Sequence, residues 1–299
     1  MRISTSTIPA AAALVAALTA LAATPAGALE SDTFAVDSPD TASEGASVVS
    51  VRTANDDPAD GVCTGTAVAP HWVVTARHCM DHLPTAGGSV RTGEGNAQRT
   101  VAVNRWLTAP QGDIALLHTA DDLGLDRYAT VDTEVPGPDT AARVYGWSSD
   151  GSGATTRLPV TDATVEGASP MALFDAHQAL TVALAQGAGI QGGDSGGPVF
   201  RDGKLTGVLS AGLFVNPDDP EEIAMDTNAA TSAAPLGDAA TWINDTIADD
   251  LSDADAAADP GAGGAFAAPY LIAIAVLLAV AAGAAVVARR RGHGGVDKQ

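Results

Sequence analysis

The chain has few basic side chains. Its 299 residues include only 15 lysines and arginines against 36 aspartates and glutamates, which gives a formal net charge of −21. Lysine occurs only at Lys204 and Lys298. A surface this acidic repels the phosphates of nucleic acids, so the composition argues against a protein that binds DNA or RNA.

Charge is also scarce in the N-terminal segment. Arg2 is followed by an apolar, alanine-rich run over residues 8–22 and then by Ala26-Gly27-Ala28. A basic start, a short apolar run and small residues two positions apart are typical of a secretory signal peptide. We therefore predict that residues 1–28 are removed before Leu29. The alternative is an uncleaved anchor helix, which would need a longer run with more large apolar side chains.

A second segment without charge lies near the C-terminus. Residues 270–288 are rich in Leu, Ile, Val and Ala, and three arginines follow at 289–291. At about 1.5 Å per residue such a helix crosses a hydrocarbon core of roughly 30 Å, and basic clusters stay on the cytoplasmic side. We predict a single transmembrane helix over 269–288, a cytoplasmic tail over 289–299 and an extracellular main domain at the cell membrane. The alternative is a buried core helix, but such helices rarely lack every polar residue.

Cysteine is nearly absent. Only Cys63 and Cys79 occur in the whole chain. An even number of cysteines in an exported protein suggests a disulfide, and closing a loop of this length would stabilise the fold by about 3 kcal/mol. The alternative is a metal site in which the two cysteines join the nearby His78 and His82.

Residues 29–45 are polar and acidic, which is typical of a pro-segment or a loose N-terminal arm. From Ala46 onward, short runs rich in β-branched residues alternate with Gly, Pro and Asp, and this pattern predicts an all-β barrel or sandwich. The runs are Val48–Val51, Gly65–Val68, Trp72–Thr75, Ile114–Leu117, Arg143–Trp147, Pro198–Phe200 and Leu205–Leu209. Residues 132–140 include Pro136-Gly137-Pro138 and predict a linker between two halves of this β region.

The end of the main domain has a helical pattern. Ile243, Ile247 and Leu251 recur every four residues, with Trp242 beside them, and predict a helix over 237–251. Residues 252–268 are rich in Asp, Ala, Gly and Pro and predict a flexible acidic stalk before the membrane. The main domain would then extend over residues 46–251.

The strongest chemical signal is Gly193-Asp194-Ser195-Gly196-Gly197-Pro198. A serine hydroxyl becomes a nucleophile only when a base takes its proton, and flanking glycines let the backbone present N–H donors to an oxyanion. An ordinary turn could share this pattern, and so could the nucleophile elbow of α/β-hydrolases, whose histidine follows the serine. The only histidine after Ser195 is His293, beyond the predicted span. The α/β-hydrolase alternative therefore fails, and the order histidine, aspartate, serine remains open.

Two upstream segments complete the pattern. Thr75-Ala76-Arg77-His78-Cys79 follows an apolar run, and Gly112-Asp113-Ile114-Ala115-Leu116-Leu117 comes later. Together with Gly193–Pro198, these segments resemble the three signature segments of the chymotrypsin-type, or trypsin-like, serine protease family, in the family's order. The resemblance covers about residues 46–251. It implies two packed six-stranded antiparallel β-barrels followed by a C-terminal helix.

The resemblance also implies a catalytic role for each matching residue. Ser195 attacks the scissile carbonyl, His78 takes and returns its proton, and Asp113 orients the histidine. The N–H groups of Gly193 and Ser195 would form the oxyanion hole. Asp81 is also near His78 in sequence, but a residue only three positions away cannot easily reach behind the imidazole.

Further features of the site follow from the same resemblance. The family's disulfide beside the histidine matches Cys63 and Cys79. Gly189, Ser210 and Gly212 would line the substrate pocket. We expect a membrane-tethered, monomeric serine endopeptidase that acts on protein or peptide substrates and needs no metal and no organic cofactor.

The chain departs from the family's pattern in two ways. Family members commonly begin with a cleaved Ile-Val-Gly-Gly-like segment whose new amino group pairs with the aspartate before the nucleophile, here Asp194. Residues 35–38 lack that segment, so we expect no activation of this kind and another partner for Asp194. Members that cleave after Arg or Lys usually carry Asp six residues before the nucleophile, where this chain has Gly189. We therefore expect an apolar P1 preference. The alternative is a basic P1 preference, with an acidic side chain that reaches into the pocket from the segment after it: Asp218, Asp219, Glu221, Glu222 or Asp226.

Two other functions remain open at this point. One is a catalytically inactive cell-surface binding module on a protease scaffold, although no triad residue is replaced. The other is a tethered esterase that uses the same triad. The remaining histidines before the predicted span, His71, His82, His118 and His177, are expected to be surface or structural residues.

Overall fold

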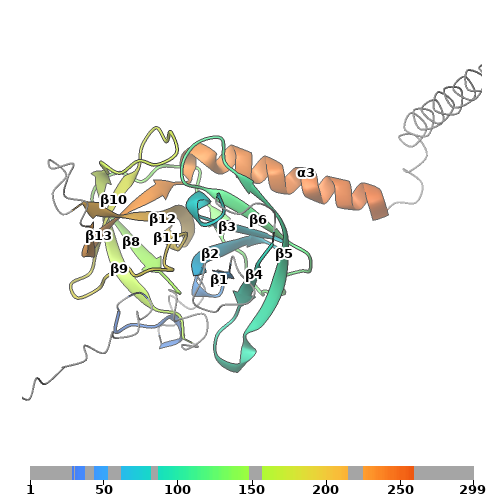
Figure 1. Ribbon diagram of the computed structural model, residues 1–299, viewed down its shortest axis with the longest axis horizontal. Coiled ribbons are helices and arrows are strands. Elements are labelled where there is room, and N and C mark those ends of the chain that lie inside the picture. Colours follow the sequence, from blue (N-terminus) through green and yellow to red (C-terminus); the bar gives the residue numbers. More distant parts are fainter. Residues whose placement is uncertain are drawn as a thin grey trace, which may run out of the picture.

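The computed structural model describes positions 29, 31–37, 44–52, 62–81, 87–147, 157–214 and 225–258 (Figure 1). Two β-barrels pack side by side, and a long C-terminal helix extends from the second barrel across the first. The predicted signal peptide, membrane span and cytoplasmic tail lie outside these positions. Within them, no helix combines the length and the apolar character needed to cross a membrane.

The first barrel is formed by the first half of the domain. Its strands are β1 (Val48–Arg52), β2 (Val62–Ala69), β3 (Trp72–Thr75), β4 (Ser89–Thr92), β5 (Arg99–Thr108) and β6 (Ala115–Thr119). They close in the order β1-β2-β3-β6-β5-β4, and each neighbouring pair is antiparallel. The apolar side chains of Val49, Val73, Val90 and Leu117 are fully or almost fully buried in its core. Two short 3-10 helices, η2 (Arg77–Cys79) and η3 (Gly95–Ala97), lie in its connections.

The second barrel is formed by the second half of the domain. Its strands are β8 (Thr140–Tyr145), β9 (Val160–Ala168), β10 (Leu180–Leu184), β11 (Pro198–Arg201), β12 (Lys204–Phe214) and β13 (Met225–Pro235). The order is β11-β8-β9-β10-β13-β12, and β11 also pairs with β12, which closes the barrel. These pairs are antiparallel too. The prediction of two six-stranded antiparallel barrels is confirmed.

The predicted strand runs all overlap strands of the two barrels, but several strands were not expected. β5 and β9 alternate between buried and exposed residues over much of their length. A strand with one solvent-facing side carries polar residues at every second position, so no continuous apolar run marks it.

The connection between the barrels is attached to the second one. A short strand, β7 (Thr130–Val131), pairs in parallel with β12 just before the predicted linker at 132–140. Asp132 is buried and forms an ion pair with Arg201 of β11. The linker thus begins at a fixed point on the second barrel.

The N-terminal arm is docked, which differs from the loose arm that its polar composition suggested. The N–H of Ala35 donates to the carbonyl of Leu158 at 2.9 Å, and the N–H of Val160 donates to the carbonyl of Thr33 at 3.0 Å. Leu29 and Ala35 are each only 1% exposed. The arm also contains a 3-10 helix, η1 (Ala35–Asp37). Its backbone therefore adds to the start of β9 and covers apolar surface.

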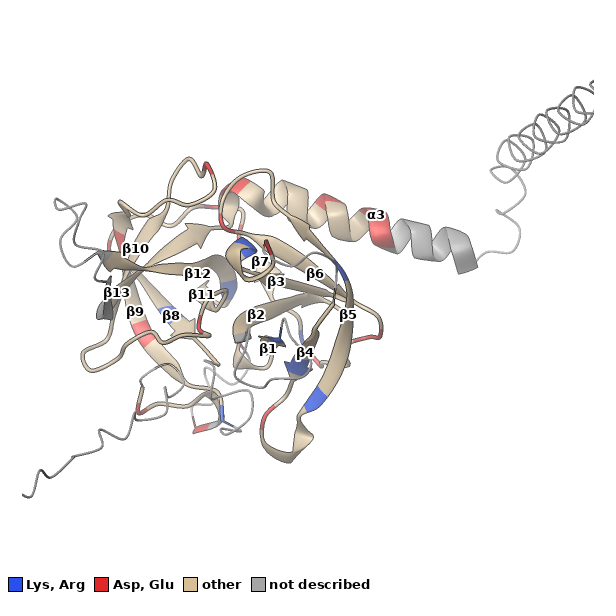
Figure 2. Ribbon diagram, viewed as in Figure 1, with Lys and Arg blue, Asp and Glu red and all other residues tan. Residues whose placement is uncertain are grey.

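The C-terminal helix is longer than expected. A 3-10 turn, η4 (Gly237–Ala239), leads into α3 (Ala240–Ala258). Ile243 is fully buried, and Trp242 and Ile247 pack against the same core, as the predicted stripe requires. The helix continues through residues 252–258, the first part of the predicted flexible stalk. Acidic residues are spread over both barrels and along α3 (Figure 2).

Candidate active site

His78 and Asp113 are brought together by two paired strands of the first barrel. Thr75 at the end of β3 lies opposite Ala115 at the start of β6, so the residues just beyond these ends meet. His78 Nδ1 lies 2.7 Å from Asp113 Oδ2, and the backbone N–H of His78 donates to Asp113 Oδ1 at 2.8 Å. The carboxylate is 1% exposed and the imidazole 34% exposed. One edge of the histidine is thus fixed while another part of the ring remains accessible.

The second barrel also contributes to this carboxylate. The hydroxyl of Ser210, on β12, donates to Asp113 Oδ2 at 2.5 Å. Three donors therefore satisfy a buried charge, as a buried carboxylate requires. The sequence placed Ser210 in the substrate pocket but did not reveal this contact, because no local pattern links it to a residue on the other barrel.

Ser195 lies on a glycine-rich turn between β10 and β11. Gly193 and Gly196 have φ values of 100° and 80°, which favour glycine. A Cβ on Gly196 would lie 2.2 Å from Thr75 Oγ1 and 2.3 Å from the carbonyl oxygen of Thr64. Only glycine fits there. The N–H of Thr64 donates to the carbonyl of Ser195 at 2.8 Å, so the turn is bound directly to the first barrel.

The described residues contain no hydrogen bond between Ser195 and His78. Catalytic hydrogen bonds are often long in unliganded enzymes and shorten only when substrate is bound. The N–H groups of Gly193 and Ser195 likewise have no acceptor within the described part of the chain. These two donors are thus available to a ligand.

Cys63 and Cys79 form the predicted disulfide. Cys79 directly follows His78, and Cys63 directly precedes Thr64, so the bond joins two segments of the site. Disulfide sulfurs are not thiolates and do not supply the ligands of the alternative metal site. His82 lies outside the described residues.

Asp194, which precedes Ser195 in the turn, is buried, with 1% exposure. Its Oδ2 accepts a hydrogen bond from the N–H of Gln191 at 2.7 Å. A Cβ on Gly146 would lie 2.2 Å from Asp194 Oδ1, so this carboxylate packs closely against the backbone that follows β8.

A pocket of about 320 Å³ opens beside Ser195. It is lined by Ile190, Gln191, Gly192, Asp194, Ser195, Leu209, Ser210, Ala211, Gly212 and Thr231. Two of the three residues predicted for the substrate pocket, Ser210 and Gly212, are among these lining residues. Gly189 is buried but is not part of the lining, and its neighbour Ile190 forms that wall instead. Most lining side chains are thus apolar or small.

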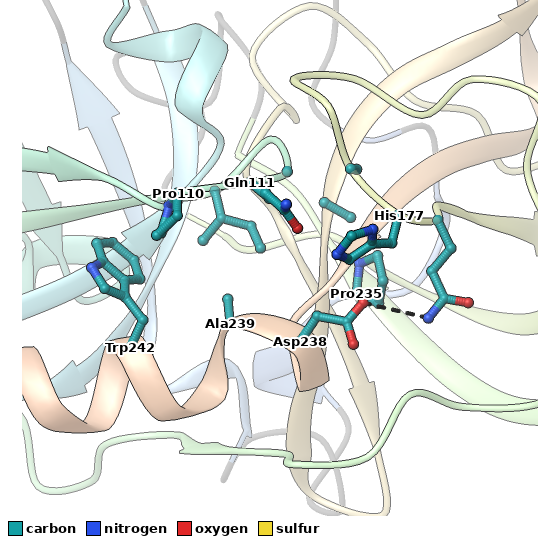
Figure 3. Close-up of a pocket in the computed structure, with 12 residues that line it drawn as sticks. Pro110, Gln111, His177, Pro235, Asp238, Ala239 and Trp242 are labelled. Atoms are coloured by element: carbon teal, nitrogen blue, oxygen red, sulfur yellow. Dashed lines mark hydrogen bonds between the residues drawn. The ribbon is translucent and has the colours of Figure 1, made fainter.

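A second, smaller cavity of about 110 Å³ lies next to the sequence neighbours of Asp113 (Figure 3). Pro110, Ala239 and Trp242 supply apolar surface, and His177 and Asp238 lie on the side away from Trp242 (Figure 3). Because Ser195 does not line this cavity, the pocket beside Ser195 is the better candidate for holding a substrate side chain at the reacting bond.

Other candidate residues have structural partners. The Asp81 side chain is 39% exposed, and its Oδ2 lies 3.3 Å from Arg77 Nε. His71 Nδ1 lies 3.2 Å from the carbonyl of Thr119. His118 lies between Asn104 and Asp250, and burial is the main reason why its pKa is lowered. His177 is exposed at the second cavity.

Two six-stranded barrels, with a histidine–aspartate pair on one and a glycine-flanked serine on the other, define a chymotrypsin-fold protein. A family model described as Trypsin matches residues 38–235. This is well over half of the chain, which therefore belongs to the trypsin family of serine peptidases.

The chain is also similar to individual proteins. An uncharacterized peptidase of Corynebacterium glutamicum is 28% identical over 185 residues, which cover 60% of this chain and 62% of that relative. A trypsin of Saccharopolyspora erythraea is 30% identical over 170 residues, or 50% of this chain and 75% of the relative. This chain thus spans less than two thirds of the corynebacterial peptidase.

A solved structure supports the fold. Neuropsin, described as a serine protease expressed in the limbic system of mouse brain, is 19% identical with a TM-score of 0.52. The match covers 68% of this chain and 94% of neuropsin. At this identity the likeness concerns the fold alone.

Proposed function

We propose that this chain is a serine endopeptidase with His78, Asp113 and Ser195 as its catalytic triad. The observation that carries the proposal is the double hydrogen bond from His78 to the buried carboxylate of Asp113. This arrangement holds the proton on Nδ1 and leaves Nε2 as the base. Ser195 lies at the adjoining pocket on a turn bound to the same barrel.

The reaction follows from these positions. As Ser195 Oγ bonds to the scissile carbonyl carbon, His78 Nε2 takes the hydroxyl proton, and the N–H groups of Gly193 and Ser195 stabilise the oxyanion. His78 then gives the proton to the leaving amine as the C–N bond breaks. Water hydrolyses the acyl-enzyme by the same steps. The triad uses no metal and no organic cofactor.

An apolar P1 side chain fits the pocket beside Ser195. Ile190, Leu209 and Thr231 line it, and no basic partner for an acidic P1 residue is among its lining residues within the described chain. Asp194 is the acid there, and one of its oxygens accepts the N–H of Gln191. A peptide library cleaved chiefly after Arg or Lys would contradict this preference.

The protein would act as a tethered extracellular enzyme. The uncharged segment at 270–288 and the arginines at 289–291 support a single span with the barrels outside. The test is alkaline carbonate extraction of membranes: the full chain should stay in the pellet and a chain ended at Asp259 should be released. Release of both would reject the tether.

No cleavage near residues 35–38 is needed for activity under this proposal. Ala35 and Thr33 are hydrogen-bonded on both sides of Phe34, which forms a β-bridge with Pro159. A cut there would remove a docked segment. N-terminal sequencing of active protein should find a start near Leu29, whereas a start at Ala35 or Val36 would overturn the proposal.

Hydrolysis of matched amide and ester substrates by the full chain and by Ser195→Ala tests the function. An endopeptidase cleaves internal amide bonds and loses this activity in the variant. Cleavage of esters alone would favour the tethered esterase. No cleavage by folded protein would favour a binding module on a protease scaffold.

A further inference from the structure

Thr64 lies where the two barrels meet and is fully buried. Its hydroxyl donates to the carbonyl of Gly193 at 2.9 Å and accepts the N–H of Trp147 at 2.9 Å. The hydroxyl is therefore both a hydrogen-bond donor and a hydrogen-bond acceptor. Its own carbonyl accepts the hydroxyl of Thr75 at 2.7 Å, so the residue is fixed to the first barrel as well.

Thr64 binds both residues of the proposed oxyanion hole. Its hydroxyl holds the carbonyl of Gly193, and its backbone N–H holds the carbonyl of Ser195 at 2.8 Å. These carbonyls belong to the planar peptide units 193–194 and 195–196. The 194–195 unit, which carries the Ser195 N–H, lies between them, and the 192–193 unit, which carries the Gly193 N–H, adjoins the first at Gly193 Cα. Holding the two carbonyls therefore restricts the rotation of both donor-bearing units. Gly193 has a φ of 100° and, as a glycine, little intrinsic preference for one backbone conformation. An external hydrogen bond therefore restricts a backbone that its own sequence leaves free.

We infer that Thr64 is a positioning residue for the oxyanion hole: its hydroxyl holds the Gly193 carbonyl by a hydrogen bond and thereby orients the neighbouring N–H donors. This inference rests on the proposed function. The residue does not line the pocket beside Ser195, so it acts through the backbone that it holds. Oxyanion donors are worth most when they are preorganised at the position of the developing charge.

Thr64→Val is the informative change, because valine keeps the shape and removes only the hydroxyl. The Gly193 carbonyl and the Trp147 N–H then lose their partner. Loss of a whole oxyanion donor lowers kcat by about 10²–10³-fold, so misalignment should lower kcat by about 10–100-fold with KM nearly unchanged. Thr64→Ser keeps the hydroxyl and should restore most of kcat.

The chain offers a matched control on the same strand. Thr66 is also fully buried, and its hydroxyl has no hydrogen-bond partner among the described residues. Thr66→Val therefore makes the same chemical change without removing a bond. It should leave kcat within about twofold of the wild type.

The direct readout is the ionisation of an oxyanion formed in the site. A peptidyl chloromethyl ketone with a terminal leucine and a carbon-13 carbonyl forms a hemiketal with Ser195 Oγ and alkylates His78 Nε2 with loss of chloride. The carbon-13 resonance moves as the hemiketal oxygen ionises. With the full-length protein in detergent, Thr64→Val should raise the pKa of this oxygen, while Thr64→Ser and Thr66→Val should not.

The outcomes separate this inference from the proposed function. No hemiketal in the wild type, together with no fluorophosphonate adduct on Ser195, would mean that the proposed function fails. A wild-type hemiketal with the same oxyanion pKa and the same kcat in folded Thr64→Val would overturn the role of Thr64 alone. A loss of kcat without a change in the oxyanion pKa would also overturn it, because the hydroxyl would then act elsewhere.

Discussion

Asp113 accepts two hydrogen bonds from His78, one from the ring Nδ1 at 2.7 Å and one from the backbone N–H at 2.8 Å. The two bonds use different carboxylate oxygens, so the carboxylate cannot rotate without breaking one of them. With Ser210 bound to Oδ2 as well, the orientation of the histidine is set by contacts from both barrels.

Asp113→Asn should abolish most activity without unfolding the protein. The backbone N–H of His78 requires an acceptor at the Oδ1 position, so the amide NH₂ must face Nδ1. The imidazole would then carry its proton on Nε2 and could not act as a base. The expected fall in kcat is about 10⁴-fold, as when the triad aspartate of a serine protease becomes an amide.

The control for this change is Asp81→Asn. Asp81 is exposed and pairs with Arg77 rather than with the histidine. Steady-state kinetics should show near-normal activity for this variant. Equal losses in both variants would mean that Asp113 is not the triad acid.

Ser210→Ala should destabilise the fold and weaken catalysis moderately. The change removes one donor from the buried Asp113 carboxylate, and a hydrogen bond to a charged group contributes about 1.5–3 kcal/mol. Denaturant unfolding should show a loss of that order, and kcat should fall far less than in Asp113→Asn. Ser50→Ala is the control, since the buried Ser50 hydroxyl has no partner among the described residues. A smaller loss of stability in Ser210→Ala than in Ser50→Ala would contradict the assignment.

Removal of the disulfide should lower the stability of the folded domain and change the geometry of the site only slightly. Cys63 and Cys79 are separated by 16 positions, and opening a loop of this length costs about 3 kcal/mol. For a domain of this size, the Tm of the Cys63→Ala, Cys79→Ala double variant should fall on the order of 10 °C. An unchanged Tm in a calorimetric scan would show that the bond contributes no net stability.

Glu94→Gln should stabilise the protein at neutral pH but not in acid. Burial raises the pKa of Glu94, and the hydrogen bond from the Leu158 N–H and the nearby Arg157 only partly offset this effect. The folded state therefore binds this proton more tightly than the unfolded state does. The stabilisation that comes from this bound proton decreases as pH rises above 4.5, the ordinary pKa of a glutamate, and stays low above the raised pKa of the folded state.

Glutamine mimics the protonated acid, so the Tm of Glu94→Gln should exceed that of the wild type at pH 7. The two values should converge well below pH 4.5. The exposed Glu166 provides the control. The difference in Tm between Glu166→Gln and the wild type should not shrink in this way as pH falls. A Tm difference for Glu94→Gln that is the same at every pH would contradict this account.

The sequence was most informative where local pattern and chemistry coincide. The apolar runs predicted strands because β-branched residues pack well on a buried pleated surface, and the stripe at Ile243 and Ile247 predicted the final helix. The segments around His78, Asp113 and Ser195 could be recognised because backbone turns and reactive groups occur together in them. The pairing of Cys63 with Cys79 followed from there being only two cysteines.

Long-range contacts were not accessible in the same way. The arm around Ala35 looks polar and loose, yet it is fixed by hydrogen bonds to Leu158 and Val160, more than 120 positions away. The sequence also contained no sign of the hydrogen bond from the Ser210 hydroxyl to Asp113 or of the one from the Thr64 hydroxyl to the Gly193 carbonyl. Each depends on how the barrels meet, which no local pattern encodes.

Exposure of the purified full-length protein to a fluorophosphonate, followed by intact mass, tests the central claim most directly. The probe phosphonylates only a serine that is activated by a base and faces oxyanion donors. We predict one adduct on the wild type, mapped to Ser195, and none on Ser195→Ala. No adduct on folded wild-type protein, or an equal adduct on Ser195→Ala, would contradict the account.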